Sequence, residues 1–408
     1  MEKKYKLMML AFSGVPFIMV LGNSMLIPEF PQIKNALDIS QFEVGLLITA
    51  FSITAAIAIP FFGYLCDQIG RIKVIVPSLF IYGAGGIISG VAALTMENPY
   101  TIILIGRVVQ GFGAAGTAPI VMALVGDIFQ SEQRSEALGI IEAANGAGKV
   151  LSPILGAAIG LISWIALFFS YALLAVPIAA GVWFWGEEKH KPKKQNIKEY
   201  LQKIGQVFEM RGFSLISVIL AGMLVLFVLF GLLSYFSDIL ESKYDICGFI
   251  KGLIIAIPIL FMSITAYVTG HILKKIKKYF KISIIIGLIL ITLTLVLLYY
   301  FNAIIIYLVF FSLLGIGAGL VLPSVNTMVT SATNKDQRGV ITSIYGSARF
   351  AGVAVGPPTF TFLLEYSRML MYFSASAISL VVLIIAIIFI KEKGMVPEKE
   401  KPSLRPEQ

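Results

Sequence analysis

The sequence GYLCDQIGRIKVI, residues 63–75, is a short polar connector between two long apolar stretches. It places Asp67, Arg71 and Lys73 close together in a chain whose residues are 58% hydrophobic and only 13% charged. A soluble domain carries roughly a quarter of charged residues. The composition therefore predicts an integral membrane protein, in which polar connectors of this kind join membrane-spanning segments.

Apolar runs long enough to cross a membrane recur along all 408 residues. A helix needs about 20 residues to span a ~30 Å hydrocarbon layer, and continuous rather than alternating apolar runs exclude a β-barrel. We therefore expect an all-α membrane protein with twelve transmembrane helices in two six-helix halves. The first run is too long for a cleavable signal and is expected to remain as an anchor. The predicted spans are 7–27, 42–65, 74–95, 100–128, 136–160, 162–185, 213–236, 247–273, 281–301, 303–330, 338–364 and 367–390.

Basic residues lie mainly on one side of the predicted spans. An even number of spans puts both termini on that side, together with most of the 32 Lys and Arg residues. The other side holds only Lys34, Lys243, Lys251 and Arg368. The positive-inside rule therefore predicts a multi-pass protein of the cell membrane with both termini in the cytoplasm. The net charge of +9 fits contact with anionic lipid headgroups rather than with nucleic acid.

The longest polar segment, residues 186–212, separates six predicted spans from six. It divides the chain into an N-terminal half (1–185), a cytoplasmic linker (186–212), a C-terminal half (213–391) and a cytoplasmic tail (392–408). Part of the linker has the spacing of an amphipathic helix lying along the membrane surface. A solvated linker is the equally supported alternative.

The two halves carry matching residues at nearly constant offsets. One net deletion of three residues reconciles an offset of 207 in the early spans with an offset of 204 in the later ones. Parallel six-helix repeats of this kind characterise one large class of transporters, with the substrate site between the halves. The matching pairs include Asp38 with Asp245, Gly45 with Gly252, Gly111 with Gly315, Arg134 with Arg338, Gly148 with Gly352 and Pro153 with Pro357.

The connector at residues 63–75 resembles the signature that the major facilitator superfamily carries between its second and third spans. The matching residues are Gly63, Leu65, Asp67, Gly70, Arg71 and Lys73, whereas Cys66 and Gln68 depart from it. In that family an acid at the end of span four pairs with the loop arginine, which makes Asp127 the expected partner of Arg71. We expect Asp67, Arg71 and Asp127 to form a latch across the inner mouth of the two halves that breaks in one conformational state. Ordinary loop charges are the alternative.

Two further stretches resemble the same superfamily. LIGRVVQGFGAAG (104–116) is similar to its span-four pattern and places Arg107 inside a span. A lone cation there is costly and by default functional, so Arg107 is a candidate for proton coupling. GKVLSPILGA (148–157) resembles the signature of its antiporters, which implies export in exchange for protons. Packing by small residues alone is the alternative. The positions that carry this second match are Gly148, Ser152, Pro153 and Gly156, with Ser152 in place of a glycine.

Candidate coupling residues share one face of the predicted span 136–160. Glu142 and Lys149 are seven residues apart, so they lie within about 20° of each other on a helix, with Asn145 between them. A carboxyl here suits a group that takes up and releases a proton in each cycle, so Glu142 is the first candidate for the proton carrier. A structural pair with Lys149 is the alternative. Glu29, at the outer end of the first span, is the second candidate, or a charge at the membrane exit.

The interior charges also bear on the substrate. Arg349 in span 338–364 joins Arg107 and Lys149 as a third interior cation, against the single buried acid Glu142. An excess of cations favours an acidic or anionic substrate, or an amphiphile with an acidic head. We expect Lys149, Arg349 and Asn145 to line the substrate cavity.

The leading hypothesis is a proton-coupled exporter of small amphiphilic, acidic compounds, similar to the drug–proton antiporters of the superfamily. Alternatives are a dedicated exporter of one native metabolite such as a siderophore or organic acid, a proton symporter for uptake, and a membrane sensor. The sequence offers no catalytic constellation for an enzyme and no ATP-binding loop. We expect a monomer without cofactor or metal, whose partners are its small-molecule substrate, protons and membrane lipid.

Overall fold

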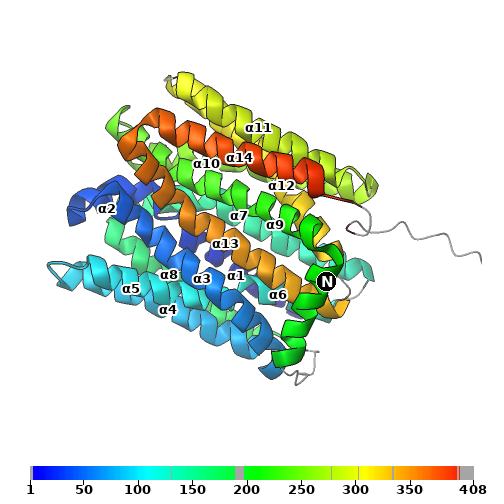
Figure 1. The fold of residues 1–408 in the computed structure, drawn as a ribbon. Coiled ribbons are helices and arrows are strands. Elements are labelled where there is room, and N and C mark those ends of the chain that lie inside the picture. Colours follow the sequence, from blue (N-terminus) through cyan, green and yellow to red (C-terminus); the bar gives the residue numbers. More distant parts are fainter. Residues whose placement is uncertain are drawn as a thin grey trace, which may run out of the picture.

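The computed structural model describes residues 3–129, 131–188, 197–276, 278–301, 303–332, 335–392 and 395. These residues form a bundle of long helices that run along a common direction (Figure 1). The N-terminal half contains α1 (Lys3–Ser24), η1 (Ile27–Glu29), α2 (Phe30–Leu37), α3 (Gln41–Ile69), α4 (Ile72–Thr95), α5 (Tyr100–Ala115), α6 (Ala118–Ile128), α7 (Ser131–Gly160) and α8 (Trp164–Trp185). The C-terminal half contains α9 (Ile197–Ser242), α10 (Gly248–Ile276), α11 (Phe280–Tyr300), α12 (Ile304–Ser331), α13 (Lys335–Tyr366) and α14 (Arg368–Phe389).

Within the described residues, 10 helical segments are long and apolar enough to cross a membrane. The two other long helices are α7 and α13, which carry Glu142, Lys149 and Arg349. Counted together they are the twelve expected spans, six in each half, and the predicted fold class is confirmed. Large apolar side chains on the outward helix faces are exposed, because lipid takes the place of water around them.

Two of the predicted spans are divided into shorter helices. The first consists of α1, η1 and α2, and the fourth consists of α5 and α6. A proline opens each new segment: Pro28 in η1, Pro31 in α2 and Pro119 in α6. Proline lacks a backbone N–H and is tolerated in the first turn of a helix, where that group would have no partner within the helix. The apolar runs therefore cross the membrane as broken rather than straight helices.

The segment predicted as a linker is largely helical. Helix α9 begins at Ile197 and continues without interruption into the seventh span, which ends at Ser242. No proline occurs between these residues, so nothing in the backbone separates a surface helix from the span. Residues 189–196 lie outside the described part of the chain.

The two halves repeat the same backbone features. Asp38 and Asp245, which follow α2 and α9, both adopt left-handed backbone conformations, with φ of 50° and 55°. Close helix contacts repeat as well: the Cα of Gly111 lies against the carbonyl of Phe51, and that of Gly315 lies against the carbonyl of Pro258. These pairs have the spacings read from the sequence.

Candidate functional site

The halves meet chiefly through α3 against α13 and through α7 against α10. We call the bundle end where α3 finishes and α7 begins the basic side, and the other end the far side. Toward the far side, Thr49 Oγ1 donates a hydrogen bond to the carbonyl of Ala354 at 2.6 Å. Ser237 Oγ donates one to the carbonyl of Ile27 at 2.7 Å. The far side is thus closed by contacts between the halves.

A cluster of charges lies where α7 faces α13. Asn145 Nδ2 donates to Glu142 Oε2 at 3.4 Å, and the charge of Lys149 interacts with those of Glu142 and Arg349. Arg349, from the other half, lies with its Cζ 5.5 Å from the ring centroid of Tyr345. Glu142 is exposed, whereas Lys149 and Arg349 are half-buried. The expected cavity residues Lys149, Arg349 and Asn145 therefore come together between the halves.

Two features of this cluster differ from the expectation. Glu142 was expected to be a buried acid, but its side chain is exposed because α7 and α13 face each other here without packing closely. Tyr345 was not anticipated, although it lies four residues before Arg349, a spacing that places both on one helix face. It is buried, and its hydroxyl has no hydrogen-bond partner among the described residues. Its hydroxyl is a polar group available at the cluster.

Arg107 has a different environment. Its fully buried guanidinium donates hydrogen bonds to the carbonyl of Leu47 through Nε at 2.9 Å and to the carbonyl of Gly22 through Nη2 at 2.7 Å. Nη1 donates to Gln110 Oε1 at 2.5 Å, and Cζ lies 4.6 Å from the ring centroid of Phe51. All of these partners belong to the N-terminal half. Arg107 thus ties α5 to α1 and α3. Of the three cations predicted inside the spans, Lys149 and Arg349 are the two that lie where the halves face each other.

The antiporter-type residues of α7 pack this helix against its neighbours. Gly148 lies against Phe17 of α1, and Gly156 lies against the carbonyl of Met25 just beyond the same helix. Ser152 is completely buried between them, and the carbonyl of Pro153 faces Gly252 of α10. The small residues of this motif therefore make close helix contacts, as their alternative interpretation expected. The same contacts hold α7, the helix that carries Lys149, in its orientation between α1 and α10.

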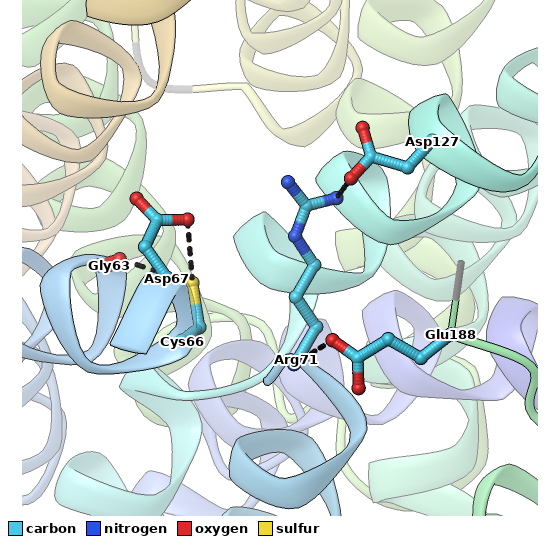
Figure 2. A network of polar contacts seen from close by, with 6 residues as sticks. All are labelled: Gly63, Cys66, Asp67, Arg71, Asp127 and Glu188. Carbon is cyan, nitrogen blue, oxygen red and sulfur yellow. Dashed lines mark hydrogen bonds and ion pairs between the residues drawn. The ribbon is translucent and has the colours of Figure 1, made fainter. Parts of the chain in front are cut away.

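The connector that opened the sequence analysis forms a network of polar contacts at the basic side (Figure 2). Arg71 Nη1 lies 2.6 Å from Asp127 Oδ2, and the backbone N–H of Arg71 donates to Glu188 Oε1 at 2.5 Å. Gly70 adopts a φ of 105°, which a residue with a side chain rarely adopts, and its Cα lies against the Glu188 carboxylate. Glu188 was not anticipated, because it lies near the start of the segment 186–212, which was interpreted as a linker.

The rest of the connector turns away from that ion pair. Figure 2 shows the Asp67 carboxylate beside the thiol of Cys66, whose Sγ donates to the carbonyl of Gly63 at 3.1 Å. Lys73 is exposed. Of the two partners of Arg71, Asp127 belongs to the N-terminal half, and Glu188 lies just after its last helix, α8. In this conformation the Arg71–Asp127 ion pair lies within the N-terminal half. The latch across the mouth of the two halves stays a prediction.

Glu29 occupies an unexpected position. The sequence made it the second candidate for the proton carrier, or else a charge at the membrane exit. Its side chain is fully buried on the far side, beside Lys251 and Glu241 of the other half. Neither carboxylate oxygen has a hydrogen-bond partner among the described residues. Gly160, the last residue of α7, packs so closely that a Cβ there would overlap the carboxylate.

The twelve-span fold and the polar site between its halves define the class of protein. The chain belongs to the major facilitator superfamily, whose family profile, "Major Facilitator Superfamily", matches residues 12–357 and 281–407. It is therefore a multi-pass membrane transporter and not an enzyme.

Comparison with known proteins indicates that this transporter is an exporter. The bacillibactin exporter of Bacillus subtilis (strain 168) is 39% identical over 396 residues, which cover 96% of this chain and 98% of that protein. Multidrug resistance protein 2 of the same organism is 27% identical over 285 residues, covering 67% and 69%. The crystal structure of a bacterial homologue of the human lysosomal transporter Spinster, inward-facing and unoccupied, has the same fold. Its TM-score is 0.77 at 14% identity, covering 96% of this chain and 99% of that one.

Proposed function

We propose that this transporter is a proton-coupled exporter of a siderophore of the bacillibactin type or of a closely related acidic amphiphile. The observation that carries the proposal is the 39% identity to a bacillibactin exporter over nearly the whole length of both chains. The multidrug relative matches less well, at 27% identity over 67% of the chain. This difference favours a dedicated metabolite exporter, an alternative in the sequence analysis, over the broader drug exporter that led it.

The excess of basic residues supports a cytoplasmic location for the basic side and for both termini. With that orientation, the far side is the outer side. The contacts between the halves then close the outer side, and the exposed Glu142 lies toward the cytoplasmic end of α7. This conformation is the one in which an exporter receives its substrate.

The two cations of the cluster supply a physical reason for an acidic substrate. Lys149 belongs to one half and Arg349 to the other, and their like charges oppose closure of the space between them. An acidic head group between the two neutralises that repulsion. Substrate binding then favours the approach of α7 and α13, which closes the cytoplasmic side and allows the outer side to open.

Glu142 is the proposed proton carrier of this cycle. Its exposed carboxyl exchanges protons with the cytoplasm in the present conformation and shares its helix face with Lys149. Closure of the cytoplasmic side would move it into a different environment, as a proton carrier requires. The gradient supplies the energy, in keeping with the antiporter-type sequence of α7.

A thermal-shift measurement on the purified protein tests the substrate class. Bacillibactin should raise the melting temperature, since a ligand at 100 times its Kd stabilises the folded state by about 2.7 kcal/mol. Lys149→Ala and Arg349→Ala should each lose most of the shift, whereas Lys6→Ala, which removes an exposed lysine away from the site, should keep it. A larger shift with a lipophilic cation, retained in both site variants, would overturn the proposal and support a multidrug exporter.

A further inference from the structure

The outer side holds a group of five charged residues that only the meeting of the two halves creates. Lys251 of α10 is fully buried, and its Nζ donates to Glu241 Oε2 of α9 at 2.6 Å. Lys34 of α2 lies 3.8 Å from Asp238 of α9. Glu29 completes the set, which we call the outer charge cluster. Two of its members come from the N-terminal half and three from the C-terminal half.

The ionised groups of this cluster do not balance. It contains three carboxyls and two ammonium groups, so full ionisation leaves one excess negative charge. Asp238 and Glu241 are ion-paired, and their side chains are each 25% exposed. Glu29 has no exposed surface and no hydrogen-bond donor among the described residues. A buried carboxylate without such partners is destabilising by several kcal/mol, and one bound proton removes that charge.

Among the described residues, the helices that pack on η1 bring no cation to Glu29 besides Lys34 and Lys251, which are already ion-paired. Helix α7 meets it with Gly160 and carries no charged residue in its last turns, after Lys149. Helices α9 and α10 contribute Glu241 and Lys251, which interact with it and are already paired with each other. In this enclosed position, a bound proton is therefore what neutralises the Glu29 carboxylate.

We propose that Glu29 is a proton-binding site that couples closure of the outer side to proton uptake from outside. This inference rests on the membrane orientation given under the proposed function, and it goes beyond that function by assigning the step that proton binding at the outer side favours. When the outer side opens, Glu29 meets external water and releases its proton into it. A proton arriving from outside neutralises it, and the halves then close over the uncharged acid. The step that returns the empty exporter to the cytoplasm-facing state is thus favoured by external acid.

Distances between spin labels on the outer side test this coupling without any substrate. One label is placed on Cys247, an exposed residue of the C-terminal half, and one on Asn98→Cys, an exposed position in the α4–α5 connection, with Cys66→Ser to remove the other thiol. In the otherwise native protein, raising the pH from about 5.5 to about 8.5 should shift the population toward longer distances. A single linked proton changes the ratio of open to closed populations by up to about tenfold per pH unit.

Variants separate Glu29 from other acids. Glu29→Gln, which mimics the neutral acid, should stay at the short distance throughout this pH range. Glu365→Gln, which alters an exposed acid at the outer end of α13, should keep the full response. The proposal is overturned if the native protein shows no pH response, a result that does not depend on how the variants fold. It is also overturned if Glu29→Gln responds as the native protein does.

The same data keep this proposal separate from the substrate assignment. A retained pH response that depends on Glu29, in a protein that bacillibactin does not stabilise, supports the proton site and rejects the substrate. Stabilisation by bacillibactin without any pH response does the opposite.

Discussion

Gly252 packs against Pro153 across the boundary between the halves, and its counterpart Gly45 packs against Pro357 in the related pair of helices. The two contacts differ in tightness. A Cβ on Gly252 would lie 2.5 Å from the Cβ of Ala157 and 2.6 Å from the carbonyl oxygen of Pro153. A Cβ on Gly45 would lie 3.4 Å from its nearest neighbour, the Cβ of Pro357. The same substitution at the two related positions should therefore have different effects.

We expect Gly252→Ala to destabilise the outer-closed state by about 1–3 kcal/mol, because the added methyl group overpacks a backbone contact. Gly45→Ala should be neutral or stabilising by up to ~1 kcal/mol, since alanine favours a helix more than glycine does. Thermal unfolding of both variants in the same detergent checks this difference. Equal melting temperatures would show that the tightness of the α7–α10 contact does not limit stability.

Arg107→Lys should greatly reduce the yield of folded protein and its melting temperature. One ammonium group cannot reproduce three hydrogen bonds to separate acceptors on α1, α3 and α5, and unsatisfied buried groups of this kind cost about 3–5 kcal/mol. Size-exclusion chromatography and thermal unfolding measure the loss. Arg349→Lys is the matched control, with a half-buried side chain, and should fold normally while it weakens the ligand-induced shift.

Asp127→Asn should reduce export several-fold without loss of membrane insertion, because Arg71 then loses its ionised partner at 2.6 Å. Export is measured in vesicles with an imposed pH gradient. The charge-exchanged double variant, Arg71→Asp with Asp127→Arg, should regain part of the activity, with an interaction energy of about 0.5–3 kcal/mol. Strictly additive losses in the double variant would mean that the pair does not act as a unit.

Glu142→Gln should abolish export driven by a proton gradient while substrate binding and energy-independent exchange continue. The amide cannot cycle between a neutral and an ionised form, which a proton carrier must do. The measurement compares accumulation against a gradient with simple exchange in proteoliposomes. Accumulation at the native rate in this variant would assign the role to Glu29 or to no carboxyl group.

The repeat was predictable because it depends on local residue types. Asp38 and Asp245, and Gly111 and Gly315, have matching environments in the structure as they have matching positions in the sequence. A close helix contact requires a small residue at the same position in both halves, even where the surrounding sequences differ. The spans followed from apolar length alone, but their interruption at prolines such as Pro119 did not, since an apolar run has the same composition on both sides of the break.

The burial of Glu29 was not predictable in the same way. It depends on Gly160, which is far away in the sequence within the same half, and on Lys251, which reaches Glu29 only when the two halves assemble. Lys251 was counted among the cations of the outer side, at the start of the predicted span 247–273, yet its side chain is fully buried. The contact of Glu188 with Arg71 was likewise not predictable, because Glu188 is one of many charged residues in the segment 186–212. Residues whose role depends on such distant partners cannot be identified from local pattern.

The polar character of α7 and α13 has a consequence for how the chain enters the bilayer during synthesis. An isolated helix with a lysine or arginine near its centre inserts unfavourably, by about 2.5–3.5 kcal/mol for that residue. Helix α7 has α1 beside it when it leaves the ribosome, but α10, which packs on its other face, is made only later. Helix α13, in contrast, follows both α3 and α9, its principal neighbours. A chain released after α8 therefore exposes the unfinished side of α7 to lipid, and such truncated chains should be recognised and degraded by the membrane's quality-control proteases more readily than chains that lack only α14.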